Sequence, residues 1–191
     1  MERAIATVHA MASARGYVYD AASQQSTPTR LVFQTQADSG PSGASEPSGP
    51  SGPVLVALED KLTLSVAKAC AAQSDHIGAA RLIVVFGASP TSAARATLAE
   101  HAGLDRPIEF FTYAELAFDI MKHSLVPKFD VLEPDEIASM LHRYRVKQAQ
   151  LPRMHSTDPC ARYLGLSRGQ VVRVTRSSAE YGDSVAYRTV T

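Results

Sequence analysis

The sequence predicts an α/β fold built from two modules, and two patterns along the chain lead to this prediction. Between Val54 and Phe111, short apolar runs typical of strands buried on both faces alternate with helical segments. This alternation favours βαβ units with mostly parallel pairing and right-handed crossovers. From His123 onward the repeat is lost. We therefore expect a mixed sheet covered by helices, followed by a smaller α+β module.

The distribution of charge supports the same division. Residues 1–120 hold 8 Lys and Arg against 12 Asp and Glu, whereas residues 121–191 hold 11 against 7. The whole chain has 19 charges of each sign and therefore no bulk field to attract nucleic acid. The asymmetry favours two parts with different surroundings, although two solvated surfaces of mixed charge explain it equally well. We place the first domain at 1–121 and the second at 122–191.

The elements of the first module follow from apolar periodicity, caps and glycines. A first helix from Glu2 to Ala14 has Ile5, Val8 and Ala12 on one side, and a glycine two residues later ends it. The other expected elements are strands at Leu31–Phe33, Val54–Leu58, Arg81–Phe86 and Ile108–Phe111, and helices at Thr63–Gln73, from a Ser89 cap to His101, and at Tyr113–Met121 behind a capping box of Thr112 and Glu115.

A low-complexity segment rich in Ser, Gly and Pro separates two of these strands. It runs from Asp38 to Pro53, and its apolar side chains other than proline are limited to Ala44. Such a composition cannot bury enough surface to order itself. We expect a flexible surface loop within the first domain.

The second module is organised around the stretch from Leu151 to Val174, whose local signals agree with one another. Asp158 can cap a helix, and Pro159 suits the first helical position because no backbone N–H is needed there. Gly165 can take the positive φ that ends this helix. The remaining expected elements are strands at Phe129–Leu132, Val171–Thr175 and Val185–Val190, and a helix opened by Pro134 with Arg143 and Arg145 near its end.

The same stretch resembles a known family. It contains L-P-R-M from Leu151 and D-P-C-A-R-Y-L-G-L-S-R-G-Q-V-V from Asp158, and it is flanked by H-S-L-V-P from His123 and A-Y-R from Ala186. This ordered string resembles the fifth subunit shared by the eukaryotic nuclear RNA polymerases, a family that also has an archaeal counterpart. The match is dense from about His123 to the C-terminus and thinner upstream.

The resemblance implies an architectural role. The chain would be a non-catalytic subunit of nuclear DNA-directed RNA polymerase, with its C-terminal module docked on the largest subunit and an N-terminal jaw near downstream DNA. Its partners would be the other polymerase subunits and DNA, with no membrane, cofactor or small-molecule substrate. A paralogue restricted to one polymerase class is an alternative that the residues leave open.

A candidate DNA-proximal site lies where the strand ending at Phe86 is followed by a helix. Helix N-termini present N–H groups and a positive dipole that accept phosphate, and hydroxyls can add donors. By resemblance this is the family's T-P-S-A loop, from which the chain departs in sequence and by two additional residues. The alternative is an ordinary capped helix. The residues of this candidate are Ser89, Pro90, Thr91, Ser92 and Arg95.

A candidate subunit interface consists of Arg153, Arg162, Tyr163 and Arg168, since the stretch around Asp158 carries too many arginines for a simple core element. Phosphate contact is one interpretation of these arginines. A protein interface is the other, because arginine and tyrosine are enriched there. The aromatic interleaving used to stack bases is absent from the sequence, so we favour the protein interface, as the resemblance also implies.

A stand-alone, metal-dependent nuclease is the alternative from a different functional class. Glu59-Asp60-Lys61 follows a buried strand, and E-x-K at a strand end is typical of nucleases whose carboxylates hold Mg²⁺. Such a site needs a further acid, and the upstream candidate is Asp38 in the low-complexity segment. The six histidines lack metal-ligand spacing, so we predict neither a metal nor a cofactor.

The expected compartment is intracellular and reducing. Cys70 and Cys160 lie far apart and suggest no disulfide framework, and Cys70 is expected to be a small buried hydrophobe. The start of the chain lacks the apolar region of a secretory signal. No apolar run approaches the ~20 residues that span a membrane, so a soluble protein is expected.

Overall fold

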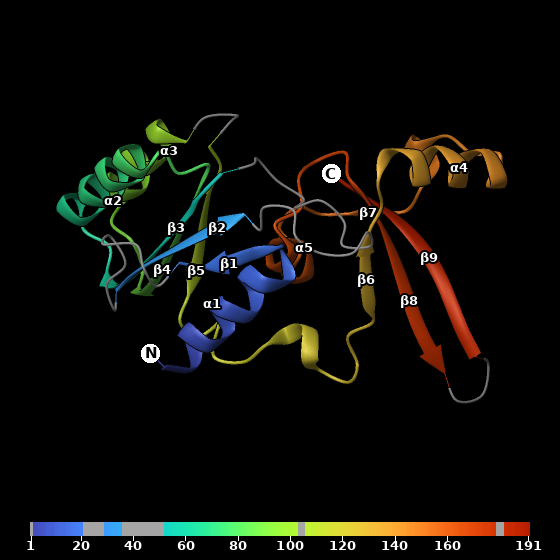
Figure 1. The fold of residues 1–191 in the computed structure, drawn as a ribbon, viewed down its shortest axis with the longest axis horizontal. Helices are drawn as coiled ribbons and strands as arrows, with labels where there is room; N and C mark the ends of the chain where they lie inside the picture. Colours follow the sequence, from blue (N-terminus) through green and yellow to red (C-terminus); the bar gives the residue numbers. More distant parts are fainter. Residues whose placement is uncertain (1, 21–28, 36–51, 103–105, 179–181) are drawn as a thin grey trace. The chain divides into compact units, whose positions relative to one another are not determined.

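The computed structural model describes residues 2–20, 29–35, 52–102, 106–178 and 182–191. Within these ranges the chain forms two compact units, which we call unit 1, up to Phe118, and unit 2, from Asp119. Each unit consists of a sheet with helices packed on it, and Figure 1 shows this arrangement within each unit. The predicted α/β class with two sheet modules is confirmed. None of the described helices combines the length and apolar character needed to cross a membrane.

The sheet of unit 1 has five strands in the order β1-β2-β3-β4-β5. The pairs β1–β2 and β2–β3 are antiparallel, whereas β3–β4 and β4–β5 are parallel, so the predicted mixed sheet with parallel βαβ units is present. The strands are β1 (Tyr17–Tyr19), β2 (Arg30–Thr35), β3 (Val54–Lys61), β4 (Arg81–Ala88) and β5 (Ile108–Thr112).

Helices cover both faces of this sheet. On one face, α2 (Leu64–Ile77) and α3 (Ser92–His101) pack on a core that includes Val32, Leu55 and Val84. On the other lies α1 (Glu2–Ala14), whose His9 ring contacts the rings of Tyr19 and Phe33 (Figure 1). This double cover explains why all five residues from Val54 to Leu58 are at most 1% exposed. Cys70 is buried in the first core, as predicted.

A charged cluster lies under α1 at the start of the parallel strands. Arg15 follows α1, Arg81 opens β4 and Glu109 lies in β5. Arg15 Nη2 donates to Glu109 Oε2 at 2.7 Å, and Arg81 Nη1 donates to the other carboxylate oxygen. Burial by itself disfavours the charged carboxylate, but the two guanidinium groups outweigh it and hold the pKa of Glu109 below its ordinary value.

The predictions for residues 113–121 and for the end of β4 are wrong. Residues 113–121 do not form the expected helix but turns followed by a short 3₁₀ helix, η1 (Ile120–Lys122). The reciprocal bonds between Thr112 and Glu115 do form, at 2.7 and 3.2 Å. However, Thr112 still belongs to β5 and the Tyr113 N–H donates to Phe86, so the sheet holds the backbone that a helix would need. Likewise β4 continues through Gly87, where we expected it to end.

The sheet of unit 2 has four strands in the order β6-β8-β9-β7. β8 and β9 form a long antiparallel hairpin, β6 pairs antiparallel with β8, and β7 pairs parallel with β9. One core joins Met154, Ala161 and Val174 beneath α5, and another joins Leu132, Met140 and Val171 beneath α4. The elements are β6 (Lys128–Val131), α4 (Pro134–Tyr144), η2 (Gln148–Gln150), β7 (Arg153–Met154), α5 (Pro159–Leu164), β8 (Val171–Ser178) and β9 (Gly182–Val190).

The local chemistry predicted for α5 is confirmed. The Asp158 carboxylate accepts a hydrogen bond from the Cys160 N–H at 2.9 Å, and Pro159 is the first helical residue. Gly165 ends the helix with φ 66°. The predicted loop from Asp38 to Pro53 lies almost entirely outside the described residues.

Candidate functional site

The candidate DNA-proximal residues lie at the carboxyl ends of the parallel strands in unit 1. β4 ends at Ala88, which pairs with Lys61 at the end of β3, and Ser89 follows at once. Ser89, Thr91, Ser92 and Arg95 are exposed, and Pro90 is half-buried. Arg95 forms no ion pair with any described residue. The edge therefore presents hydroxyls, a helix N-terminus and two exposed cations, Lys61 and Arg95, to solvent.

The helix cap at this edge is Thr91, not Ser89 as predicted. The Thr91 hydroxyl accepts from the Ala94 N–H at 3.3 Å, and its own N–H donates to the Leu62 carbonyl. This backbone bond ties the loop to the end of β3, so α3 starts two residues later than the sequence indicated. Pro90 consequently precedes the cap, and Ser92 is the first helical residue.

The end of β3 carries an acidic group, Glu59, that is already engaged. Arg30 donates to Glu59 at 2.6 Å and to Gln73 at 2.9 Å.

Tyr113 packs beside Gly87, where an added Cβ would lie 3.3 Å from the ring. Its hydroxyl is buried and has no hydrogen-bond partner among the described residues. Burial, reinforced by the carboxylates of Asp60 and Glu59, raises the pKa of Tyr113.

The metal site of the nuclease alternative is not assembled in the described part of the chain. Its Glu59 is bound by Arg30, and its expected further acid, Asp38, lies outside the described residues. In the ranges that the structure describes, no three His, Cys, Asp or Glu side chains are grouped to hold an ion. The arrangement around Glu59 supports an ion pair between β2 and β3.

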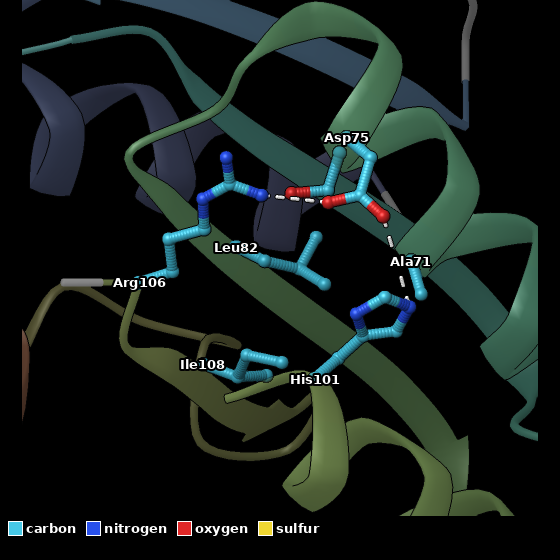
Figure 2. A pocket seen from close by; sticks show the side chains of 7 residues that line it. Ala71, Asp75, Leu82, His101, Arg106 and Ile108 are labelled. Atoms are coloured by element: carbon cyan, nitrogen blue, oxygen red, sulfur yellow. Dashed lines mark hydrogen bonds and ion pairs between the residues drawn. The ribbon is translucent and has the colours of Figure 1, made fainter. Parts of the chain in front are cut away.

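A small pocket also lies on the side of unit 1 that α2 and α3 cover. Figure 2 shows the Asp75 carboxylate between the side chains of Arg106 and His101, above Leu82 and Ile108. Arg106 Nη1 lies 2.7 Å from Asp75 Oδ1, and His101 Nε2 lies 3.8 Å from Oδ2. The cavity of about 10 Å³ could hold at most a water molecule. This half-exposed clasp joins α2, α3 and the start of β5.

The candidate interface residues of unit 2 divide between surface and core. Arg153 and Arg168 are exposed and Arg162 is half-buried, but Tyr163 is 4% exposed. The short helix α5 turns Tyr163 inward together with Ala161, so the chain itself already covers this ring. The Tyr163 ring therefore packs beneath this surface. An interface role would need the ring to be exposed.

The strand pairing brings two of these arginines to one end of unit 2. Arg153 pairs with Thr189 on β9. The turn that carries Arg168 is bound to Val190, the residue after Thr189, because the Gly169 N–H donates to the Val190 carbonyl at 2.9 Å. Gln148 donates to the Gly169 carbonyl at 2.6 Å and steadies the same turn. Sequence reasoning missed β7 and this contact, because a two-residue strand leaves no periodic pattern.

Comparison with known proteins identifies unit 2. Residues 118–190 match the family model described as RNA polymerase Rpb5, C-terminal domain. The chain is 37% identical over 132 residues, which is 69% of this chain and 62% of the relative, to the Caenorhabditis briggsae protein named DNA-directed RNA polymerases I, II, and III subunit RPABC1. It is 42% identical over 109 residues, or 56% of this chain and 55% of the relative, to the protein of that name from Dictyostelium discoideum.

A plant relative has a different name. The Arabidopsis thaliana protein named DNA-directed RNA polymerase subunit 5-like protein 1 is 44% identical over 108 residues, covering 56% of this chain and 51% of the relative. The chain thus spans between about half and three fifths of the length of these relatives. A match over 132 residues is longer than unit 2, so the similarity extends into unit 1. Residues 118–190 thus match the C-terminal domain of the fifth common RNA polymerase subunit, and the chain is similar to members of that family.

Proposed function

We propose that this chain is a non-catalytic, architectural subunit of DNA-directed RNA polymerase in the nucleus. The observation that carries the proposal is the match of residues 118–190, nearly all of unit 2, to the Rpb5 C-terminal domain. Relatives named as a subunit of RNA polymerases I, II and III add support. The engaged state of Glu59 argues against the nuclease alternative.

In this proposal the two units have different roles. Unit 2 anchors the chain on the largest polymerase subunit through Arg153, Arg162 and Arg168, while unit 1 lies near downstream DNA. Arg153 and Arg168 are exposed and suit a docking surface, because each guanidinium presents several donors in one plane. The exposed edge around Ser89 suits phosphate because it offers a helix N-terminus with Lys61 and Arg95 beside it.

Affinity purification of the tagged full chain tests this division. The double substitution Arg153→Ala and Arg168→Ala should weaken polymerase recovery about 30-fold, as for loss of about 2 kcal/mol at an interface hot spot. Arg95→Ala is the control, because it removes an exposed arginine from unit 1 without touching unit 2. It should leave assembly intact and act only on DNA contact. Circular dichroism would verify that each variant is folded.

The opposite pattern would reverse the assignment of the units. If Arg95→Ala loses the polymerase while the double variant retains it, unit 1 is the anchor. The identity of the polymerase recovered distinguishes a subunit common to all classes from a paralogue restricted to one. A Mg²⁺-dependent nuclease activity that Glu59→Ala abolishes would replace the proposal with the enzyme alternative.

A further inference from the structure

One face of the unit 2 sheet has a register that places a row of side chains on the same side. In the hairpin, Arg173 pairs with Tyr187 and Thr175 with Val185. Because side chains alternate between faces along a strand, these four point to one face. β6 extends the row, since Asp130 lies opposite Arg173 and Lys128 opposite Thr175, and the hairpin continues it with Ser177 opposite Asp183.

Helix α4 covers only one end of this face. Its Met140 and Leu141 pack with Val171 and Tyr187, at the end of the hairpin near residue 171. The last helical residue, Tyr144, brings its ring to 5.8 Å from that of Tyr187. Beyond it, β8 and β9 extend past β6 with no helix over them in the described part of unit 2 (Figure 1).

The uncovered part forms a groove of about 930 Å³. Its lining includes Ser124 to Pro127, which lead into β6, and Arg143 and Tyr144 at the end of α4. Three large apolar side chains line it although they are exposed: Leu125 at 85%, Tyr144 at 54% and Val185 at 50%. Apolar side chains gathered in one concave surface indicate a binding site, whereas isolated ones do not.

The groove also carries more positive than negative charge. Its basic residues are Lys128, Arg143, Arg173 and Arg176, and its acidic residues are Asp130 and Asp183. Lys128 and Arg173 lie 3.1 and 3.3 Å from the two oxygens of Asp130 and are paired with it. Asp183 accepts from Ser177 at 2.6 Å. Arg143 and Arg176 also line the groove, and neither forms an ion pair with a described residue.

We propose that this groove binds an acidic segment of a neighbouring polymerase subunit, with a large apolar side chain of that segment seated against Val185 and Tyr187. The inference rests on the proposed function and adds a second contact surface to it. None of the arginines assigned to the anchor lines this groove. The acidic residues of the segment pair with Arg143 and Arg176, and its apolar residue covers the exposed valine.

A nucleic acid would fit the same groove less well. The rings of Tyr144 and Tyr187 pack on each other, which leaves them poorly placed to stack on bases. The exposed Leu125 and Val185 offer surface that only an apolar partner group can use.

Photo-crosslinking in the purified polymerase tests the inference directly. The tagged full chain carries the photoreactive residue p-benzoylphenylalanine in place of Val185. In the matched control the same residue replaces Val18, which is also on a strand and is 51% exposed, but in unit 1. We expect position 185, and not position 18, to crosslink to a subunit peptide in which Asp and Glu outnumber Lys and Arg.

Each other outcome also decides the question. If the polymerase is recovered but position 185 links to nucleic acid, to a basic segment or to nothing, the inference is wrong and the proposed function stands. If no polymerase subunit is recovered with the unsubstituted chain, the proposed function fails and the inference fails with it.

Substitutions provide an independent measure of the same contact. Val185→Asp places a negative charge where the acidic segment would lie and should reduce polymerase recovery about tenfold, whereas Val18→Asp should not. Both side chains are half exposed, so both variants should fold, which hydrogen exchange of β8 and β9 would verify. Recovery of Val185→Asp within about twofold of the unsubstituted chain would overturn the inference.

Discussion

The two sheets of this protein treat their charged residues in opposite ways. In unit 1, the side chains of Arg15 and Arg81 are 3% and 4% exposed and enclose Glu109 beneath α1. In unit 2, Arg173 is 38% exposed and pairs with Asp130 on an open sheet face. The first arrangement is possible because helices cover both faces of the sheet. The second is possible because α4 covers only one end of the unit 2 sheet.

This difference teaches where each unit can interact. The charges sealed inside unit 1 are occupied by one another and are not offered to a partner. Unit 2 keeps charged and apolar side chains together on an open face, as docking surfaces do. A module of about 70 residues has a small core, and a partner that covers such a face would offset this.

The largest effect that would sharpen this comparison comes from Glu109→Gln. The substitution leaves two buried guanidinium groups with a neutral acceptor and should destabilise unit 1 by about 3 kcal/mol. Hydrogen exchange measured by mass spectrometry can follow the units separately. Protection should fall across β3 to β5 and remain unchanged in β8 and β9.

Asp75→Asn is the matched control for that substitution. Asp75 also pairs with an arginine in unit 1, but its side chain is 47% exposed. Water screens such a pair, so the loss should stay below about 1 kcal/mol. Equal losses for the two variants would mean that the cluster around Glu109 is solvated, and the contrast between the units would then disappear.

The pH dependence of stability should separate the units in the same way. The pKa of Glu109 is lowered from its ordinary value of 4.5 in the folded chain, because two arginines outweigh the effect of burial. Its contribution to stability is therefore complete above that value and is lost as pH falls through the lower pKa of the folded state. Exchange protection of β3 to β5 should fall below pH 4.5, and the Glu109→Gln variant should lack this component.

Sequence reasoning succeeded where structure depends on local chemistry. The cap at Asp158, the proline after it and the positive φ of Gly165 lie within eight residues, and each acts on its own neighbours. Buried strands such as Val54–Leu58 were equally predictable, because double burial leaves a continuous apolar run. The family resemblance also rested on this local stretch.

The rest depends on which distant segments meet. Arg15 and Glu109 are 94 positions apart, and no pattern within either helix or strand marks them as partners. The groove of unit 2 required the register of β8 against β9, whereas the sequence indicated only that both are strands. The inward position of Tyr163 and the later start of α3 likewise follow from packing and from the bond to the Leu62 carbonyl.

The smallest predicted effects compare one helix cap from each unit. Asp158→Ala removes a 2.9 Å cap bond from the six-residue helix α5, and Thr91→Ala removes a 3.3 Å cap bond from the ten-residue helix α3. Each should cost about 1 kcal/mol, more for Asp158 because its bond is shorter and its helix has fewer other contacts. Ser89→Ala should change stability by less than about 0.5 kcal/mol, because Ser89 does not cap α3.

Urea unfolding of the full chain, with hydrogen exchange to locate each loss, measures these three effects. Loss of protection should be confined to α3 for Thr91→Ala and to α5 with its adjoining strands for Asp158→Ala, since the two helices belong to different units. Ser89→Ala is the internal control, because it removes a hydroxyl two residues from the Thr91 cap. If it costs as much as Thr91→Ala, α3 begins at the position that the sequence indicated. If Asp158→Ala also lowers protection in α3, the two units unfold together, and the contrast between their sheets does not extend to their stability.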